Sequence, residues 1–380
     1  MKKLLGRIAD YIRETDKVLL SMCIFASLLG AVMVMSATNY TGTAKQFFVQ
    51  IGALVIGLIA VVVISAFTDY ETLTKFWPLY AVLSIGLVVL TFFIGYAPPG
   101  TDDKAWLLLP GGITFQPAEP LKIAFILTFA KHVSLLGDNI PLHHVLLLCL
   151  HGVVPCALIH FQGDDGSALV LAVIFIVMLF AAGVKMRYFA IGASLAAVAS
   201  PIAWFLVLND SQRNRFISLF HIEDNLYGDG WQQWRARIAM ANGGFFGKGL
   251  FRGDYVQSNQ VPEGHNDFMF ASIGEELGML GAICVVILLS AICIRILYIA
   301  HICGNKMGKI ICCGVFGMLA IQSILNIGMC VSLLPVIGIT LPFFSAGGSS
   351  LVCTFLGIGL VVNVYMHRGG RIIYLHEDNY

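Results

Sequence analysis

Apolar runs of about twenty residues recur from one end of this sequence to the other, and they constrain its fold more than any other feature. An α-helix of that length crosses a hydrocarbon core of roughly 30 Å. Hydrophobic residues make up 58% of the 380 residues and charged residues only 12%, whereas roughly 25% of an average soluble domain is charged. The runs are continuous and do not alternate, which excludes a transmembrane β-barrel. The sequence therefore predicts an all-α polytopic membrane protein, with residues 1–380 as a single membrane domain.

Ten membrane spans are predicted from these runs, with one large loop between the seventh and the eighth. The predicted spans are 18–37, 48–67, 77–96, 118–134, 143–161, 167–183, 188–208, 267–294, 310–331 and 347–366. An even number of spans places both termini on one side, and fourteen of the 23 Lys and Arg residues fall on that side. Cytoplasmic loops carry an excess of these cations, so we expect both termini in the cytoplasm.

The large loop, residues 209–266, is then the only sizeable segment outside the membrane, and it faces outward. Trp231, Trp234 and Ile238 recur within it at helical spacing and predict an amphipathic helix. Tryptophan with arginine beside it suits the lipid headgroup plane, so we expect this helix to contact membrane lipids at the interface. A solvated loop with a packed turn is the alternative.

The loop ends in Val261–Gly278, where five ionisable residues gather at the start of the eighth span. They are Glu263, His265, Asp267, Glu275 and Glu276. Asp267 is expected at the outer mouth of this span, where a helix N-terminus would lower its pKa unless apolar surface offsets the effect. A helix N-cap is the purely structural alternative for this aspartate. His265 could orient Asp267 or contact a substrate.

Small residues follow Asp267 on one face of the predicted eighth helix. Ala271, Gly274, Gly278 and Gly281 share its side of a continuous helix. The spacing of Gly274 and Gly278 permits another helix to approach closely. This face directs Asp267 into the bundle and away from lipid, which makes it the leading candidate for a functional residue.

Further charges are predicted inside the membrane, where an ionisable side chain indicates function by default. Glu275 and Glu276 lie two turns deeper in the eighth span and need a partner or a proton, and the fourth span offers the other charges. Its Glu119 and Lys122 are i,i+3 neighbours on one helical face. They form either a structural ion pair or a cation presented to an anionic group in a central cavity.

Three polar features point to the same outer side. The turn Gln162–Ser167 between the fifth and sixth spans contains Asp164, and Asn326 lies within the ninth span. Residues 335–349, which include Ser345, are rich in Gly, Pro and Ser. Irregular backbone at membrane depth is tolerated only where it is buried or lines a cavity, so we expect this segment to line the mouth of the site.

Cofactor and nucleic-acid motifs are missing from the sequence. It contains no P-loop, no dinucleotide fingerprint and no histidine metal motif. A formal net charge of +1, without a long basic patch, argues against a nucleic-acid partner. The ten cysteines fall in predicted spans or cytoplasmic turns, so no disulfide framework is expected.

Four motifs together resemble those of the SEDS family (shape, elongation, division and sporulation), which includes FtsW, RodA and SpoVE, and are most similar to RodA. They are Phe115–Lys122, Gln162–Ser167, Val261–Gly278 and Asn326–Ser350, in matching order and spacing over almost the whole chain. The resemblance implies a peptidoglycan polymerase of the bacterial cytoplasmic membrane. Such enzymes join lipid II units on the outer face, usually with a class B penicillin-binding protein. It identifies Asp267 as the essential aspartate, and Glu119 and Lys122 as the family's charged pair.

The chemistry of that family suits these residues. Lipid II carries its sugar on a pyrophosphate, which leaves without a general acid once its charge is held, so one carboxylate suffices. Asp267 would take the proton of the acceptor's 4-hydroxyl, which attacks the donor's anomeric carbon. Lys122, Arg213 and Arg215, with a divalent cation (Mg or Mn) as a further candidate, would stabilise the pyrophosphate. Further expected substrate contacts are Glu119, His265, Asp164 and Ser345, and the expected supporting residues are Glu263, Glu275, Glu276 and Asn326.

Several positions depart from the family pattern. The family's arginine in the 97–115 loop is Ala105, its threonine before the aspartate is Asn266, and the proline of its Gln-Pro-Asp is Gly163. Its usual glycine near the end of the ninth span is Ser332. These changes bear on substrate contacts more than on the activity.

Two other functions compete with polymerisation. A lipid II flippase could use the intramembrane charges as a path for a headgroup, but the inner mouths carry no matching charge and no inverted repeat is evident. A non-catalytic scaffold for a penicillin-binding protein would leave Asp267 dispensable. A role in elongation, division or sporulation is not decided by these residues.

Overall fold

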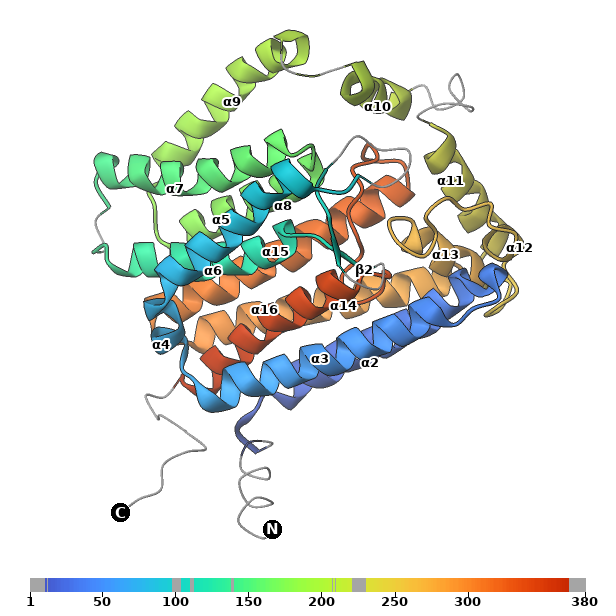
Figure 1. The fold of residues 1–380 in the computed structure, drawn as a ribbon, viewed down its shortest axis with the longest axis horizontal. Coiled ribbons are helices and arrows are strands. Elements are labelled where there is room, and N and C mark those ends of the chain that lie inside the picture. Colours follow the sequence, from blue (N-terminus) through green and yellow to red (C-terminus); the bar gives the residue numbers. More distant parts are fainter. Residues whose placement is uncertain are drawn as a thin grey trace.

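The structure, a computed structural model, describes residues 11, 13–97, 104–109, 113–137, 140–206, 208, 210–220 and 230–368. Within these ranges the chain is a helical bundle with one short antiparallel sheet of β1 (Leu107–Leu109) and β2 (Ile113–Phe115). The long helices run side by side across the molecule (Figure 1). The predicted all-α polytopic membrane fold is confirmed. The chain termini, whose cytoplasmic location was predicted, lie outside the described residues.

Within the described residues, ten long helices overlap the ten predicted spans. They are α2 (Lys17–Ala37), α3 (Lys45–Phe67), α5 (Trp77–Ile94), α6 (Ala118–Ser134), α7 (Leu142–Phe161), α8 (Asp165–Ala181), α9 (Met186–Leu206), α14 (Gly278–Ile302), α15 (Lys306–Cys330) and α16 (Gly348–Met366). Of the described helices, eight are long and apolar enough to cross a membrane, and α6 and α8 have 17 residues each. The shorter elements are η1 (Asn39–Thr41), α4 (Tyr70–Lys75), α10 (Asp210–Phe220), α11 (Trp231–Gly243), α12 (Asp254–Gln257) and α13 (Met269–Glu276).

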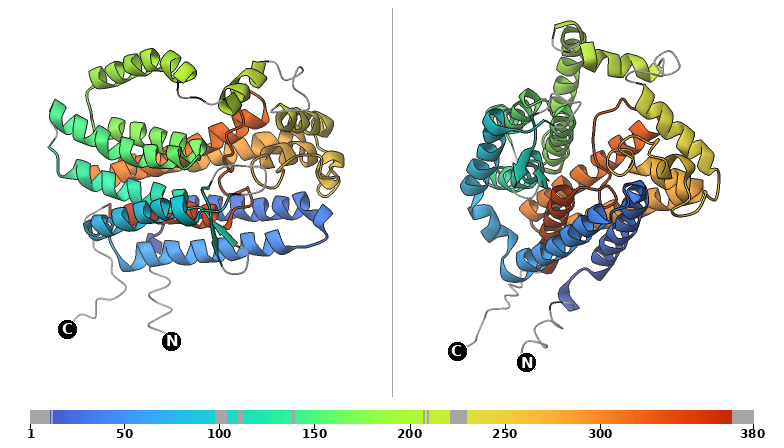
Figure 2. Two further views of the ribbon diagram at one scale, coloured as in Figure 1. Left: turned by 45° about the horizontal axis from the view of Figure 1, so that its top comes forward. Right: turned by 45° about the vertical axis from the view of Figure 1, so that its right-hand side comes forward.

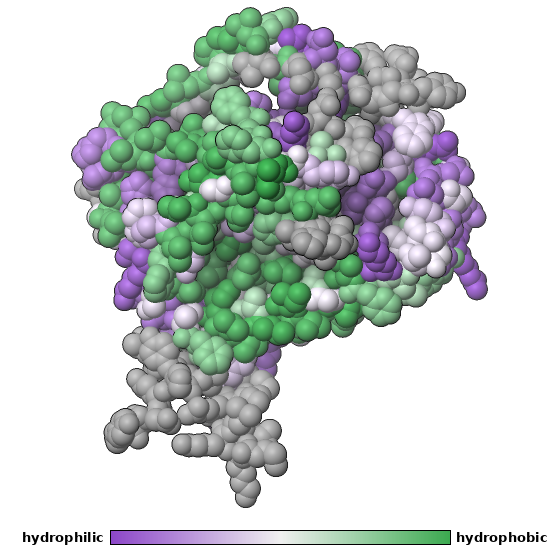
Figure 3. All heavy atoms as spheres, viewed as in Figure 1, coloured by the Kyte–Doolittle hydropathy of each residue, from purple (hydrophilic) through white to green (hydrophobic). Residues whose placement is uncertain are grey.

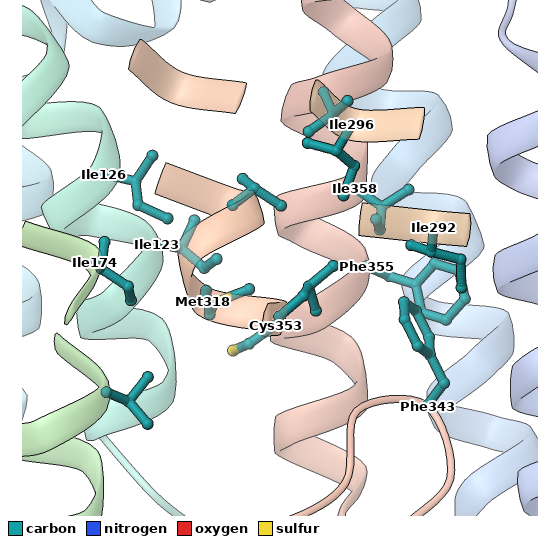
Figure 4. Close-up of a cluster of buried hydrophobic side chains, with 14 of the residues drawn as sticks. Ile123, Ile126, Ile174, Ile292, Ile296, Met318, Phe343, Cys353, Phe355 and Ile358 are labelled. Atoms are coloured by element: carbon teal, nitrogen blue, oxygen red, sulfur yellow. The ribbon is translucent and has the colours of Figure 1, made fainter. Parts of the chain in front are cut away.

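Two helices, α15 and α16, form the centre of the bundle. In each, 72% of the most apolar stretch is buried, against 28% in α3. Phe355 of α16 packs edge-to-face on Phe343 in the core (Figure 4). On the facing helix α3, a Cβ at Gly57 would lie 2.8 Å from Cβ of Phe355. A glycine at this position therefore allows α3 and α16 to pack closely.

Polar side chains gather at the two ends of the bundle, and apolar ones form the belt between them on the face shown in Figure 3. At one end, Thr15 before α2 contacts Met366 at the end of α16, with 3.7 Å between Oγ1 and Sδ. The first and last described spans therefore begin and end together, as an even number of crossings requires. At the opposite end lie α11, α12 and α13 (Figure 1). Helix α9 stands apart from the bundle (Figure 2), with none of its most apolar stretch buried.

The predicted eighth span, 267–294, is not one continuous helix. It is divided into α13 and α14 at Gly278, whose φ of +69° belongs to the left-handed region. The N–H groups of Met279 and Leu280 donate to the carbonyls of Gly244 and Phe245, at 3.0 and 3.1 Å. These bonds satisfy donors that a helix leaves unpaired at its start. Main-chain carbonyls of the long loop thus pair with the start of α14 at the break. The spacing of apolar residues along the sequence could not reveal this contact.

The predicted close approach to the small-residue face does occur. Helix α11 packs against α13, and a Cβ at Gly243 would lie 2.1 Å from the carbonyl oxygen of Gly274. The buried face of α11 contains Gln233 and Ala236, while Trp231 is 38% exposed. The helix predicted in the loop is therefore present. Its contact with lipid stays a prediction, and residues 221–229 of the loop lie outside the described residues.

Candidate active site

Asp267 lies in a tight turn directly before α13, among the loop elements at one end of the bundle. The N–H groups of Asn266 and Phe268 both donate to the carbonyl of Glu263, at 2.9 and 3.1 Å. Glu263 has a φ of +47°, a left-handed conformation that costs roughly 1–2 kcal/mol without a glycine. Asp267 lies directly before α13, as predicted, but the N-cap of this helix is Phe268, so the alternative that Asp267 caps the helix is wrong.

Asn326, near the C-terminal end of α15, holds the main chain of Asp267. Its side chain is fully buried, as the sequence predicted. Nδ2 donates to the Asp267 carbonyl at 2.8 Å and to the Ile339 carbonyl at 2.7 Å. One amide group therefore joins the turn before α13 to the irregular segment before α16.

The segment 335–347 donates hydrogen bonds to two further carbonyls of the same turn. Ser345 Oγ donates to the Asn266 carbonyl at 2.6 Å, and the N–H of Ala346 donates to the His265 carbonyl at 2.8 Å. Together with the hydrogen bond from the side-chain amide of Asn326, these bonds mean that three consecutive carbonyls, those of residues 265–267, accept from partners outside the turn. Ser345 thus supports the turn, and its contact with substrate stays a prediction.

The carboxyl group of Asp267 has no hydrogen bond or ion pair with the part of the chain that the structure describes. A Cβ at Gly338 would lie 3.6 Å from its Oδ2, so the segment 335–347 borders it directly. Burial, with the negative charges of Glu263 and Asp164, raises the pKa of Asp267 to about 7. The helix N-terminus was expected to lower this pKa unless apolar surroundings offset the effect; here loss of water offsets it, and two nearby acids disfavour the carboxylate further.

Asp164 is the second half-buried acid of the site and caps the start of α8. Its Oδ1 accepts from the N–H of Ser167 at 2.8 Å, and Nε2 of Gln116 donates to its other oxygen. Burial raises the pKa of Asp164, whereas the bonds from Ser167, the charge of Lys122 and the bond from Gln116 lower it. Asp164 acts on Asp267 and Lys122 acts on Asp164, so the three groups share one electrostatic environment.

Lys122 is completely buried in α6, and its ammonium group lies 2.8 Å from the carboxylate of Glu119. The i,i+3 pair expected from the sequence is therefore present. An unpaired charge in this interior would cost several kcal/mol, so each residue needs the other for the fold. A contact of Lys122 with an anionic substrate stays a prediction.

Glu275 and Glu276 are both fully buried in α13, but their partners are not in the fourth span. The carboxylate of Glu275 accepts from the N–H groups of Tyr255 and Val256, at 2.9 and 2.8 Å. The carboxylate of Glu276 accepts from the hydroxyl of Ser36 on α2, at 2.6 Å. These partners lie on α12 and α2, which pack against α13. The two glutamates hold the long loop to the bundle, in keeping with a supporting role.

The two predicted arginines, Arg213 and Arg215, both lie on α10. Arg213 on α10 donates to the carbonyls of Trp204 and Phe205, at 2.8 and 3.0 Å, and so closes the end of α9. Arg215 lies exposed on the same helix. Their binding of a pyrophosphate stays a prediction.

His265 and Glu263 form the rim of the site. His265 is half-buried; burial lowers its pKa, and the charge of Glu263 acts in the opposite direction. The exposed carboxylate of Glu263 accepts from Nδ2 of Asn266 at 2.7 Å. Threonine, the residue that the resemblance leads one to expect in place of Asn266, has no amide to make this bond.

Two contributors to the site were missed from the sequence. Gln116 stands in the first of the four motifs, and that motif was its signal. The N–H of Ala346 belongs to the main chain and carries no side-chain signature. Among the described residues, no group of three or more His, Cys, Asp or Glu side chains is placed to hold a metal ion.

The departures from the family pattern have local structural consequences. Gly163 has a φ of +95°, which the ring of a proline forbids. Ser332 has a φ of +58° where glycine would be unstrained. Ala105 is 2% exposed, so no long side chain projects from this position.

Comparison with known proteins identifies the family. A family model described as cell cycle protein, covering FtsW, RodA and SpoVE, matches residues 16–369. The chain belongs to this family. This FtsW–RodA–SpoVE member is 32% identical over 369 residues to the probable peptidoglycan glycosyltransferase FtsW of Geobacter sulfurreducens, covering 95% of this chain and 97% of the relative. It is 33% identical over 267 residues to the peptidoglycan glycosyltransferase MrdB of Escherichia coli K12, covering 70% and 71%.

Solved structures agree with this family. One chain, from a peptidoglycan synthase complex that coordinates polymerisation and crosslinking, matches with a TM-score of 0.79 and 28% identity, covering 93% of this chain and 98% of that chain. The Thermus thermophilus rod shape determining protein RodA matches with a TM-score of 0.68 and 26% identity, covering 93% and 97%. The fold of this family member is therefore shared over nearly its whole length.

Proposed function

We propose that this chain is a peptidoglycan glycosyltransferase that joins lipid II units into glycan strands, with Asp267 as the general base. The observation that carries the proposal is a half-buried carboxyl, free of hydrogen bonds within the described residues, whose pKa is raised to about 7. When the pKa of a general base lies near the working pH, a large fraction of the base is in its charged form and that form still has a high affinity for a proton. The names of the relatives support the reaction class.

In the proposed reaction, Asp267 accepts the proton of the acceptor sugar's 4-hydroxyl. The hydroxyl oxygen forms a bond to the anomeric carbon of the donor, and the bond from that carbon to the pyrophosphate oxygen breaks with its electron pair. The pyrophosphate leaves as an anion and needs no proton. The hydrogen bonds to the three carbonyls of residues 265–267 hold the base in place. This matters because misplacement by about 1 Å costs on the order of a hundredfold in rate.

Positive charge near the leaving group would stabilise this transition state. Lys122 is the buried cation of the cluster, and its charge acts on Asp164 beside the base. The described residues do not form a metal site by themselves. A divalent cation (Mg or Mn), held jointly by substrate and protein, stays part of the proposal, but no step above depends on it.

The site is proposed to face the outside of the bacterial cytoplasmic membrane, with both termini in the cytoplasm. Support comes from the excess of Lys and Arg on the terminal side of the predicted spans. A class B penicillin-binding protein is the proposed partner, because one matching structure belongs to a complex that couples polymerisation to crosslinking. Relatives named FtsW and MrdB match at similar identity, so elongation, division and sporulation all stay within the proposal.

A lipid II flippase and a non-catalytic scaffold are the competing functions. A flippase must expose its path to both sides in turn, whereas the acids Asp164, Asp267 and Glu263 cluster at one end of the described bundle. A scaffold has no use for a carboxyl whose charged form is destabilised. Neither alternative explains the environment of Asp267 as directly as a general base does.

The decisive experiment measures polymerisation of lipid II by the purified full chain with its penicillin-binding partner. Asp267→Asn keeps the size of the side chain and removes the base, so glycan strands are expected to fall below detection. Glu263→Gln is the matched control, because it removes a nearby carboxylate at the rim and should retain most of the activity. Equal strand formation by Asp267→Asn and the wild type would overturn the catalytic assignment.

A further inference from the structure

One polar side chain near the start of α3, that of Gln50, is buried inside the bundle. Only 1% of it is exposed, whereas its neighbours Phe48 and Val49 are 68% and 38% exposed. Burial of a side-chain amide is costly unless its polar groups are paired. The partners of Gln50 therefore indicate what this residue does.

Both partners of Gln50 belong to the main chain of the segment before α16. Its Nε2 donates to the carbonyl of Ser345 at 3.0 Å, and its Oε1 accepts from the N–H of Gly347 at 3.4 Å. Helix α3 packs along α16, which this segment leads into (Figure 1). One side-chain amide thus holds the main chain of residues 345–347 at both ends, from a position 295 residues before Ser345.

The same three residues make the hydrogen bonds that reach the turn of Asp267. The N–H of Ala346, between the two residues that Gln50 holds, donates to the carbonyl of His265 at 2.8 Å. The hydroxyl of Ser345 donates to the carbonyl of Asn266 at 2.6 Å. Gln50 is therefore linked to the turn through a single short stretch of main chain.

The segment is also closely packed against α2. A Cβ at Gly30 would lie 2.4 Å from the carbonyl oxygen of Phe343. Phe343 has a φ of +69°, a strained conformation that persists only where the surroundings hold it. Contacts with α2 and with Gln50 on α3 therefore both restrain the segment before it reaches α16.

We infer that Gln50 is a positioning residue of the proposed reaction: it holds residues 345–347 so that Ser345 and Ala346 keep the turn of Asp267 in place. The inference rests on the proposed function, because it concerns the placement of the general base. Three observations carry it: the burial of the amide, its hydrogen bonds at both ends, and the bonds from the same stretch to the turn. The segment keeps its other contacts without Gln50, so its loss should loosen the turn and leave the chain folded.

Hydrogen–deuterium exchange of the purified full chain tests the structural part of the inference without substrate. Gln50→Met keeps the length of the side chain and removes both hydrogen bonds. The peptide that covers residues 261–268 is expected to exchange at least about threefold faster in this variant. Gln46→Met is the matched control, because Gln46 is exposed one turn earlier on the same helix, and its exchange should equal that of the parent chain. Unchanged exchange in Gln50→Met would overturn the inference.

Polymerisation of lipid II by the same variants, with the penicillin-binding partner, tests the catalytic part. Gln50→Met should lower kcat roughly 10- to 100-fold with little change in KM, because a misplaced base weakens the transition state and not substrate binding. A looser turn admits water to Asp267 and lowers its raised pKa, so the midpoint of the pH–rate profile should shift to lower pH. Loss of folded protein alone would reduce the rate equally at every pH and leave the midpoint unchanged.

Gln50→Asn provides a milder variant, in case Gln50→Met does not accumulate in the membrane. Its amide stands on a side chain one methylene shorter, too short to keep both bonds, so its kcat should lie between those of Gln50→Met and the parent chain. A parental kcat and an unshifted midpoint in a Gln50 variant whose turn exchanges faster would overturn the positioning role. Failure of the proposed function would be seen separately, as parental activity of Asp267→Asn with Gln50 intact.

Discussion

Asn326 donates a hydrogen bond of 2.8 Å to the main-chain carbonyl of Asp267, from a position 59 residues further along the chain. A buried amide on the central helix α15 thus fixes the backbone of the candidate base. The Ile339 carbonyl accepts the other N–H of the same amide. The turn that contains Asp267 and the irregular segment 335–347 are therefore expected to move as one unit.

Replacement of this amide should impair the reaction without unfolding the protein. Asn326→Ala leaves two buried carbonyls without a donor, at about 1–3 kcal/mol. We expect a drop of roughly 10- to 100-fold in kcat, measured as the rate of lipid II polymerisation. Ser323→Ala is the control, because its hydroxyl only returns to the Leu319 carbonyl of its own helix. Equal rates for the two variants would contradict a positioning role for Asn326.

The activity should depend on pH through Asp267. Its pKa is raised to about 7, and a general base acts only as the carboxylate. The polymerisation rate should therefore rise as pH increases through 7, level off above that value, and fall about tenfold per pH unit below it. Glu263→Gln removes a nearby negative charge, so it should shift the midpoint to lower pH. A rate that is flat between pH 5.5 and 8.5 would exclude Asp267 as the titrating group.

The Glu119–Lys122 pair offers a test of structural against functional roles. Lys122→Met leaves Glu119 buried without its cation, at roughly 3–5 kcal/mol, and we expect low membrane levels of this variant. The double variant Glu119→Gln with Lys122→Met removes both charges and should recover its level. Polymerisation by the recovered double variant decides the question: lost activity indicates a cation that serves the substrate, and full activity leaves a structural pair only.

Ser332 is a site where a single substitution should stabilise the protein. Its φ of +58° is strained for serine, and its buried hydroxyl has no hydrogen-bond partner. Ser332→Gly relieves the strain and should raise the free energy of unfolding by about 1 kcal/mol. Thermal unfolding in detergent measures this gain. Ser332→Ala, which keeps the Cβ, should show a much smaller change, and a lower Tm for the glycine variant would refute the strain argument.

Local patterns in the sequence accounted for the helices and for one pair in the site. Each apolar run had to become a membrane span, because only helices satisfy their own backbone in lipid when no barrel can form. Lys122 lies one turn from Glu119 on the same helix, so spacing alone predicted their contact. The small residues before Gly278 also predicted correctly that another helix packs there.

The environment of Asp267 depends on segments that no local pattern connects. Its raised pKa comes from burial together with Glu263 and Asp164, the latter more than a hundred residues away. The carbonyls of its turn accept from α15 and from the segment before α16. Read locally, a carboxylate before an apolar helix should have a lowered pKa; in the folded chain, burial and the two nearby acids outweigh the helix. Hydrophobic periodicity is a property of neighbours along the chain, whereas desolvation and nearby charge are properties of neighbours in space, and for this aspartate the second set prevails.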